Sequence, residues 1–309
     1  MKSEKMINDW KAIPYDWRLS LEDLLDSGRE YSDGRIYYTV ENGTTPDPYI
    51  IKELHRLASS SVTGKVTIIA HSNGGLLTKE LTNRLGDEAS KLIDKIIFVA
   101  VPQAGTPAAI GALLHGFDQG LPMDLFPLFI SPSESRLLGN NMSSAYNLLP
   151  SEKYFNYVSD PVITFDNSDL LTSWRTKYGS KINTGEGLYN FLSDQSRETL
   201  PTKNDLVSII SLNTYLLSNA KELHDKKLDD WIAPPGISLI EIAGWGKETL
   251  AGIEYYQGVK TECKTRNDLF GCSKYSTSSI LEYNPKMTFD GDGTVVIPSA
   301  LLTASSTGV

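Results

Sequence analysis

The side chain most suited to nucleophilic chemistry in this sequence is a serine at residue 72. It lies in Ala70-His71-Ser72-Asn73-Gly74, which follows a short apolar run at 65–70 and precedes a helical pattern. A serine at a sharp strand-to-helix turn is lifted clear of the sheet, and only small residues two positions before and after it fit so tight a turn. Ala70 and Gly74 meet that requirement. The pattern predicts a nucleophile elbow with Ser72 as the nucleophile.

The residue after the serine opens the expected helix. A helix N-terminus carries partial positive charge and free backbone N–H groups. The N–H of Asn73 is therefore expected to donate to the oxyanion that forms when Ser72 attacks an acyl ester. A serine in an ordinary strand-to-helix turn is the alternative. The buried strand before Ser72 and the helix after it favour the catalytic interpretation.

A carboxylate far along the chain is the expected partner of this nucleophile. Phe289-Asp290-Gly291-Asp292-Gly293 follows a strand-like piece late in the sequence. In enzymes with this elbow the chain order is serine, acid, histidine, and the acid holds the histidine in its useful tautomer. Asp292 is the predicted acid, with Asp290 in reserve. Taken alone, Asp-Gly pairs are typical of plain turns.

The histidine that should complete the set does not follow the acid. The four histidines are His55, His71, His115 and His224, and all precede Asp292. His71 is the direct neighbour of the nucleophile and is expected to point away from it. His115 and His224 remain alternatives that would break the usual chain order.

The elements around the serine predict an α/β fold with a mostly parallel sheet flanked by helices. The runs at 65–70 and 93–101 are β-branched and nearly all apolar, as in strands buried on both faces of a parallel sheet. A helical pattern that ends at Gly86 joins them, which makes a βαβ unit. Strand texture returns at 237–243, with short pieces at 254–256 and 288–289.

The segment between these strand regions is expected to form a cap. Residues 103–235 are helical and loop-like in pattern, so the core is predicted over 1–102 and 236–309. An apolar stretch in the cap contains Leu125, Phe126 and Phe129 and is broken by prolines. We expect a mobile lid there that contacts substrate and, transiently, a lipid surface. The alternative is that these side chains belong to the core of the cap.

Composition excludes several classes of function. The net charge of −9 and the pI near 5.0 disfavour nucleic-acid binding. No apolar run approaches the ~20 residues that span a bilayer. The sequence contains no metal-ligand cluster or phosphate loop, so no cofactor is expected. Two cysteines, Cys263 and Cys272, favour a local disulfide over two free thiols.

Several motifs together resemble the lecithin:cholesterol acyltransferase-like family of α/β hydrolases, which includes lysosomal phospholipase A2 and bacterial lipases. The matching pieces are Pro14-Tyr15-Asp16-Trp17-Arg18, the elbow at 70–75, the segment 100–107, Gly244-Trp245-Gly246 with Thr249 downstream, and Gly291-Asp292-Gly293-Thr294-Val295. The resemblance implies an α/β-hydrolase fold, Ser72 as nucleophile and Asp292 as triad acid. It implies lipid acyl esters as substrates, with hydrolysis or acyl transfer through an acyl-enzyme. No obligate protein partner is evident from the sequence.

The sequence departs from the family pattern at both ends. Only 13 residues precede Pro14, and no histidine follows Asp292. We therefore expect a clipped piece of a longer protein, whose second oxyanion donor and triad histidine lie outside this chain. Residues 1–11 are polar and provide no signal peptide, although the family and the cysteine pair favour a secreted or extracytoplasmic protein. The alternative is an inactive fragment, or a non-catalytic protein that binds lipid or a partner.

Overall fold

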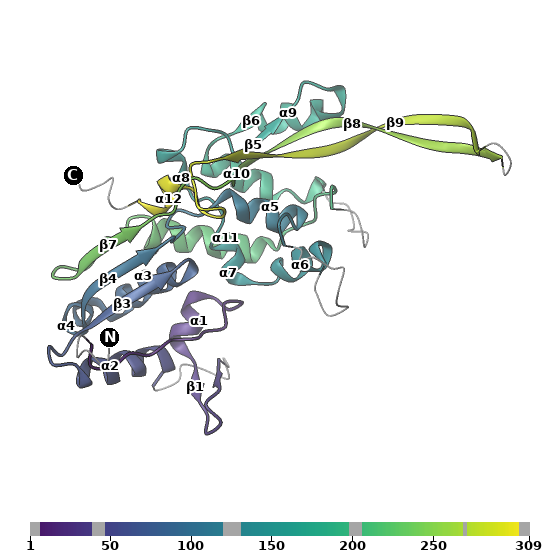
Figure 1. Ribbon diagram of the computed structural model, residues 1–309. Helices are drawn as coiled ribbons and strands as arrows, with labels where there is room; N and C mark the ends of the chain where they lie inside the picture. Colours follow the sequence, from purple (N-terminus) through teal and green to yellow (C-terminus); the bar gives the residue numbers. More distant parts are fainter. Residues whose placement is uncertain (1–6, 39–46, 120–130, 198–205, 268–270, 303–309) are drawn as a thin grey trace.

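A three-stranded parallel sheet holds the residues that precede and follow Ser72. The computed structural model describes residues 7–38, 47–119, 131–197, 206–267 and 271–302. The strand order is β3 (Val66–His71), β4 (Ile93–Val99), β7 (Ser238–Ile242), and both pairings are parallel. Helix α3 (Asn73–Leu85) connects β3 to β4, so the predicted βαβ unit is present (Figure 1). The chain is a mixed α/β protein with a parallel sheet.

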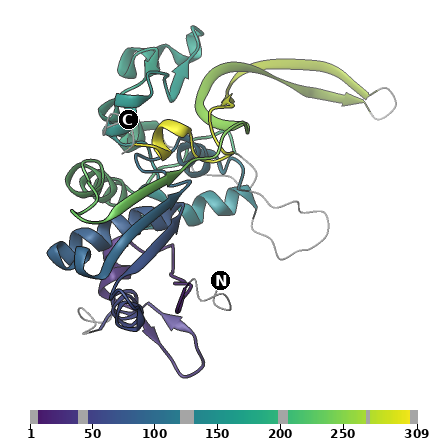
Figure 2. The ribbon, with the colours of Figure 1, turned by 60° about the vertical axis from the view of Figure 1, so that its left-hand side comes forward.

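Helices cover one face of this sheet. Leu76 and Leu81 of α3 pack with Ile96 and Phe98 of β4 in one hydrophobic core, which α1 (Leu21–Asp26) and α2 (Tyr49–Ser60) extend. Ser20 caps α1 by accepting a hydrogen bond from the Asp23 N–H. The short hairpin of β1 (Arg29–Glu30) and β2 (Ile36–Tyr37) lies beside these helices (Figure 2).

The other face of the sheet corrects the expectation of strands buried on both sides. Ile69, Ile97 and Ile240 form one row across the three strands, and Ile69 is 70% exposed. Ile242, one row further along, is 50% exposed. Strand burial alternates because helices pack on one face, whereas no described residue covers this row of isoleucines. The β-branched composition correctly predicted strands. It did not predict that only one face of the sheet is covered.

The segment between β4 and β7 forms a second hydrophobic core. Ile110, Phe165, Phe191 and Leu217 are among its buried side chains. Its helices are α5 (Pro107–His115), α6 (Pro132–Gly139), α7 (Ser143–Tyr146), α8 (Glu152–Tyr157), α9 (Thr172–Tyr178), α10 (Gly185–Ser193) and α11 (Thr214–Leu223), followed by a π-helical turn at His224–Leu228. Two further short helices, α4 (Ala89–Leu92) and α12 (Ile297–Ala300), lie outside it.

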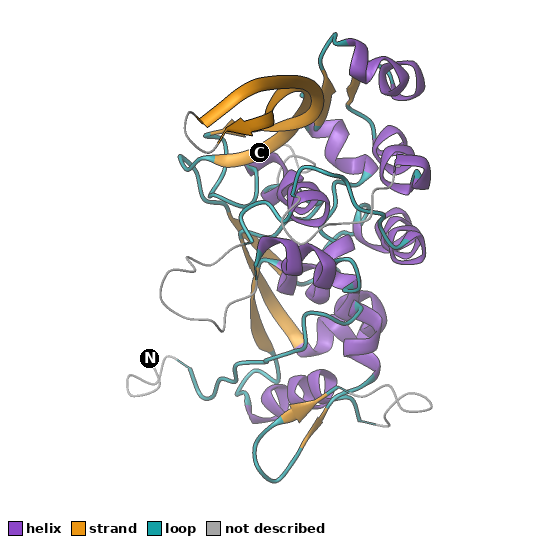
Figure 3. Cartoon of the chain, turned by 90° about the vertical axis from the view of Figure 1, so that its right-hand side faces the viewer, coloured by secondary structure: helices purple, strands orange, loops and turns teal. Residues whose placement is uncertain are grey.

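This segment also contributes strands, so it is not purely helical. A four-stranded sheet has the order β6 (Lys181–Ile182), β5 (Ile163–Phe165), β8 (Thr249–Asn267), β9 (Gly271–Thr288). The expected short piece at 254–256 lies in β8, and Thr288 of the expected piece at 288–289 is the last residue of β9, so both belong to one long antiparallel hairpin (Figure 3). Strand β8 also pairs in parallel with β5. Strands from the expected cap (103–235) and from the expected core (236–309) therefore share one sheet. The division into core and cap stays a prediction.

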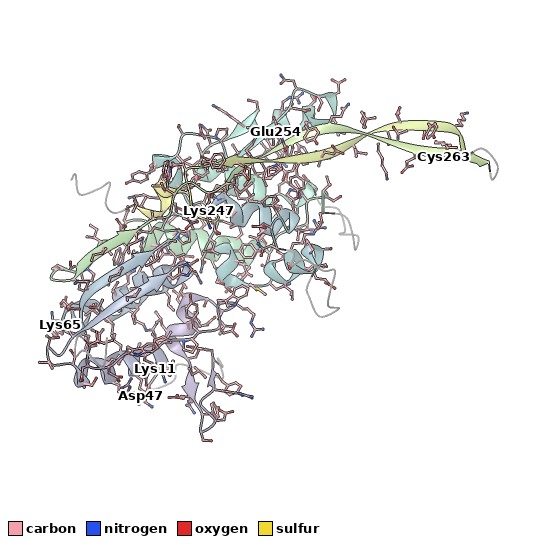
Figure 4. The ribbon with its side chains drawn as sticks, viewed as in Figure 1. Lys11, Asp47, Lys65, Lys247, Glu254 and Cys263 are labelled. Atoms are coloured by element: carbon pink, nitrogen blue, oxygen red, sulfur yellow. A yellow bond between two sulfur atoms is a disulfide. The ribbon has the colours of Figure 1, made fainter. Side chains whose placement is uncertain are left out.

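The hairpin of β8 and β9 projects away from the rest of the protein (Figure 1). Figure 4 labels Glu254 nearer its base and Cys263 near its far end. Cys263 and Cys272 form a disulfide that links the two strands. The disulfide predicted from the cysteine pair is confirmed.

Candidate active site

The backbone turns abruptly at Ser72. This residue has φ +53° and ψ −129°, a conformation that side chains other than glycine rarely adopt. Only Ala100 and Asp118 share a positive φ among the non-glycine residues that the structure describes. The Ser72 N–H donates to the Val99 carbonyl at 3.0 Å, and the Ser72 carbonyl accepts from the Gly75 N–H at 2.9 Å. These bonds fix the turn between β3 and α3.

The tightest contact of the turn involves Gly75. A Cβ on Gly75 would lie 2.3 Å from both methyl carbons of Val101, which follows β4. A Cβ on Gly74 would meet only the Tyr15 hydroxyl, at 3.6 Å, which is an ordinary contact. Ala70 is buried, with 5% exposed. The sequence predicted that small residues are needed at Ala70 and Gly74. The position with the least room for a side chain is instead Gly75.

Asn73 is the first residue of α3, so its backbone N–H faces the turn that carries Ser72. Its side chain interacts with the Tyr15 hydroxyl. Burial raises the pKa of the Tyr15 phenol, and the hydrogen bond with Asn73 opposes that rise. Tyr15 therefore stays protonated beside the start of α3. The sequence reasoning gave Tyr15 no role, although the string Pro14-Tyr15-Asp16-Trp17-Arg18 marked it.

A cavity of about 720 Å³ opens beside Ser72. Its walls come from the segment before α1, from the elbow and from α5, α6 and α7, and most of them are apolar. The apolar lining includes Ile13, Trp17, Ala109, Leu113, Leu138, Met142 and Leu148. The predicted lid residues Leu125, Phe126 and Phe129 lie outside the described residues.

Asp292 lies in a turn that connects to the same cavity. Its Oδ1 accepts hydrogen bonds from the N–H groups of Thr294 and Val295, both at 2.9 Å. The Thr294 carbonyl accepts from the Thr106 hydroxyl at 2.6 Å, and Thr106 and Thr294 line the cavity with Ser72. Among the described residues, only Oδ1 of this carboxylate has donors. Its other oxygen is therefore available to a further donor.

Asp290 lies in a different environment. Its side chain is exposed, and its hydrogen bonds among the described residues come from its backbone. Gly244 packs against Asp292 instead, since a Cβ there would lie 2.6 Å from the Asp292 Cβ. The two carboxylates thus differ in their local packing.

A family model named lecithin:cholesterol acyltransferase matches residues 6–303. The chain belongs to the lecithin:cholesterol acyltransferase family. It is 26% identical over 259 residues to the phospholipase A(1) LCAT3 of Arabidopsis thaliana, which covers 81% of this chain and 53% of that protein. It is 24% identical over 262 residues to lecithin-cholesterol acyltransferase-like 4 of the same plant, covering 81% of this chain and 45% of that protein. The chain spans about half of the length of these two relatives.

One solved structure, the Tle4-Tli4 complex, is similar with a TM-score of 0.48 and 16% identity. The match covers 79% of this chain and 51% of that one.

His115 and His224 make their hydrogen bonds away from Ser72 in this member of the lecithin:cholesterol acyltransferase family. His115 is fully buried, with Nδ1 2.8 Å from the Leu206 carbonyl and Nε2 2.8 Å from the Tyr255 hydroxyl. His224 is buried, with Nδ1 2.7 Å from Asp229 and Nε2 2.8 Å from the Asn147 carbonyl. Both rings are therefore held by contacts within the fold.

The two early histidines also lack a triad geometry. His55 lies on α2, with Nε2 3.8 Å from a Glu88 carboxylate oxygen. His71 lines the cavity, but no hydrogen bond joins it to Ser72 in the described part of the chain. The described residues thus bring together Ser72, Asn73 and the turn of Asp292, and none of the four histidines makes a hydrogen bond to Ser72 among them.

The described residues contain no group of three or more His, Cys, Asp or Glu that could hold a metal ion. They also contain no helix long and apolar enough to cross a membrane.

Two neighbours in the motif string Pro14-Tyr15-Asp16-Trp17-Arg18 lie in different environments. Arg18 makes a bidentate ion pair with Asp16, with Nε–Oδ1 at 2.7 Å and Nη2–Oδ2 at 2.6 Å. Trp17 is 57% exposed and lines the cavity.

Proposed function

We propose that this chain carries the nucleophile and the acid of an enzyme that cleaves or transfers the acyl groups of lipid esters, on an α/β-hydrolase fold. The observation that supports this most is the positive φ of Ser72 at the mouth of a largely apolar cavity. Strained backbone at a non-glycine residue persists where surrounding structure enforces it, and such residues cluster at active sites. Membership of the acyltransferase family agrees with this reaction class.

The proposed reaction has two halves. The Ser72 Oγ attacks the ester carbonyl while its proton passes to a histidine base, and the Asn73 N–H donates to the oxyanion. The protonated base then gives the proton to the leaving alcohol, and an acyl-Ser72 ester remains. Water or a second alcohol gives its proton to the base and attacks this ester. The bond between the acyl carbon and Ser72 Oγ breaks, the carboxylic acid or new ester leaves, and the base returns the proton to Oγ. Asp292 orients the base and stabilises its charged form.

The base is proposed to be a histidine other than the four in this chain. The closed hydrogen-bond sets of His115 and His224 support this, because either ring would have to abandon both partners to reach Ser72. Asp292 is the better acid because its turn is tied to the cavity through Thr294 and Thr106.

The substrate class follows from the cavity and the relatives. A volume of about 720 Å³ with mainly apolar walls suits an acyl chain better than a polar ligand. One relative is named a phospholipase A(1), and the other is an acyltransferase-like protein. Water is the default acceptor because transfer requires a second site for an alcohol. Leu125, Phe126 and Phe129 are proposed to contact the acyl chain and, transiently, a lipid surface.

An extracytoplasmic location belongs to the same proposal. The disulfide between Cys263 and Cys272 supports it, because such bonds persist in oxidising compartments.

A second candidate function is lipid or partner binding without catalysis. The observation that favours it is that His115, His224 and His55 have partners elsewhere in the fold, and that no hydrogen bond joins His71 to Ser72 in the described part of the chain. Binding would use the same cavity, and Ser72 would then be dispensable.

Substitution of Ser72 separates the two candidates. In the whole protein, Ser72→Ala should reduce hydrolysis of a soluble p-nitrophenyl ester by about 10³-fold or more. Hydrolysis by Asp292→Asn should fall by a similar factor. Asp290→Asn is the matched control, and its rate of hydrolysis should stay close to that of the parent. Hydrolysis that survives Ser72→Ala would reject the nucleophile. Equal losses from the two aspartate variants would reject the assignment of the acid.

A further inference from the structure

The outer part of the β8–β9 hairpin is charged differently from the rest of the chain. We call residues 257–267 and 271–281 the distal ribbon. The sequence from 257 to 281 has four basic and two acidic side chains, a net charge of +2 in a chain whose net charge is −9. Lys260 pairs with Glu262 at 2.8 Å, whereas Lys264 and Lys274 have no salt bridge to a described residue. A net-positive ribbon therefore projects from an acidic protein (Figure 4).

The two faces of the distal ribbon differ in chemistry. The register pairs Val259 with Ser279, Thr261 with Thr277 and Cys263 with Tyr275, so these residues share one face. These three pairs contain no charged side chain, and Val259 and Tyr275 among them are 66% and 64% exposed. The opposite face pairs Lys260 with Ser278 and Glu262 with Ser276. The ribbon is thus amphipathic, with an uncharged face bordered by lysines.

The edges of the distal ribbon disfavour a second strand as its partner. The pairing of β8 with β5 ends at Tyr255, and no described strand pairs with either edge beyond that point. Lysines on exposed edges oppose pairing with another chain. Lys260, Lys264 and Lys274 have this position, so a second copy that adds a strand is not the favoured occupant.

A lipid surface fits these features better. Tyrosine places its ring at the boundary between hydrocarbon and water, and lysine stems lie along apolar material while their charges remain in water. Basic side chains are also attracted to anionic headgroups. The exposed Tyr275 and Val259, with Lys264 and Lys274 nearby, supply both kinds of contact.

The ribbon is long enough to separate the acidic body of the protein from an anionic surface that would repel it. From Gly258 to Asn267 the strand extends about 30 Å, at roughly 3.3 Å per residue. Charges are screened within about 8 Å at physiological ionic strength. The far end can therefore approach an anionic surface while the acidic body remains outside the range of repulsion.

We propose that the distal ribbon docks the protein on anionic lipid surfaces through its uncharged face and its lysines. This docking does not involve Ser72, so it stands apart from the proposed catalysis.

The test is co-flotation of the chain with vesicles of phosphatidylcholine, with and without phosphatidylglycerol. Each basic side chain near such a surface contributes about fivefold to binding. The variant Lys264→Gln/Lys274→Gln is therefore expected to bind phosphatidylglycerol vesicles about 30-fold more weakly. The matched control is Lys52→Gln/Lys91→Gln, which removes two exposed lysines elsewhere and should bind like the parent. Val259→Ser/Tyr275→Ser tests the uncharged face and should also weaken binding.

The vesicle-binding results test the docking role independently of the proposed ester hydrolysis. Ser72→Ala should bind vesicles as the parent does. Equal affinity for both vesicle types, absence of binding, or equal losses in the two lysine variants would overturn the docking role and leave the ester-hydrolysis assay intact. A dimer that dissociates in the distal-ribbon variant, without vesicle binding, would assign the ribbon to a second copy instead. Circular dichroism and the intact disulfide by mass spectrometry show that each variant is folded.

Discussion

Replacing Ser72 with glycine should make the protein more stable than replacing it with alanine. The backbone at residue 72 has φ +53° and ψ −129°, which glycine adopts without steric cost and alanine does not. Both substitutions remove the hydroxyl, so the comparison isolates the Cβ. Strain of this kind costs about 1–3 kcal/mol.

Glycine also has a cost of its own, since its unfolded chain is more flexible. That cost is about 0.5–1 kcal/mol. The difference leaves Ser72→Gly at least as stable as Ser72→Ala, and more stable by up to roughly 2.5 kcal/mol. A residue in an ordinary helix should behave in the opposite way. At Lys52, exposed in α2, glycine should be less stable than alanine by about 1 kcal/mol.

The assay is urea unfolding followed by far-ultraviolet circular dichroism, with all four variants in one buffer. The reasoning requires opposite signs at the two positions. If Ser72→Gly were less stable than Ser72→Ala by the same amount as the Lys52 pair, residue 72 would have no strained backbone, and the elbow geometry would be wrong.

Three further predictions follow from packing, charge and the hairpin. Gly75→Ala should lower the free energy of unfolding by about 1–3 kcal/mol, measured with urea, because its Cβ would overlap the Val101 methyls, and Val101→Ala should recover part of the loss. Burial lowers the pKa of Lys79 from the ordinary value of 10.5 to about 8. Between these two pH values the unfolded chain binds more protons than the folded chain, so the free energy of unfolding should rise with pH. Lys79→Met should flatten that rise in pH-dependent unfolding. Cys263→Ser/Cys272→Ser should speed hydrogen exchange in the distal ribbon and leave the global unfolding midpoint unchanged, since the disulfide lies far from both cores.

Each of these has a clear contrary result. Additive effects of Gly75→Ala and Val101→Ala would show that the two side chains do not meet. An unchanged pH profile in Lys79→Met would place the pH dependence elsewhere. A lower global midpoint in the double serine variant would mean that the hairpin folds together with the cores.

Local signals in the sequence predicted the region around Ser72 well. The strand at 65–70, the helix that ends near Gly86 and the next strand all appear, because β-branched runs and helical periodicity act over short distances. The disulfide between Cys263 and Cys272 was also predictable, since two nearby cysteines leave few pairings.

Features that depend on tertiary contacts were not predictable in this way. The long hairpin was missed because the outer part of β8 is rich in Thr and Lys, the outer part of β9 is rich in Ser, and neither shows much apolar alternation there. The exposed row at Ile69 was missed because composition does not reveal which sheet face has a neighbour. The requirement at Gly75 depends on Val101, which lies in a different element, and the occupied rings of His115 and His224 depend on partners distant in sequence.

The central claim is that Ser72 is the nucleophile. The most direct test is labelling of the chain with a fluorophosphonate in the presence of imidazole, which can act as the missing base, followed by peptide mass spectrometry. The account predicts one phosphonyl adduct, on the peptide that contains Ser72, and no adduct in Ser72→Ala. An adduct on another serine, or equal labelling of the two proteins, would contradict it, as would an unlabelled parent chain.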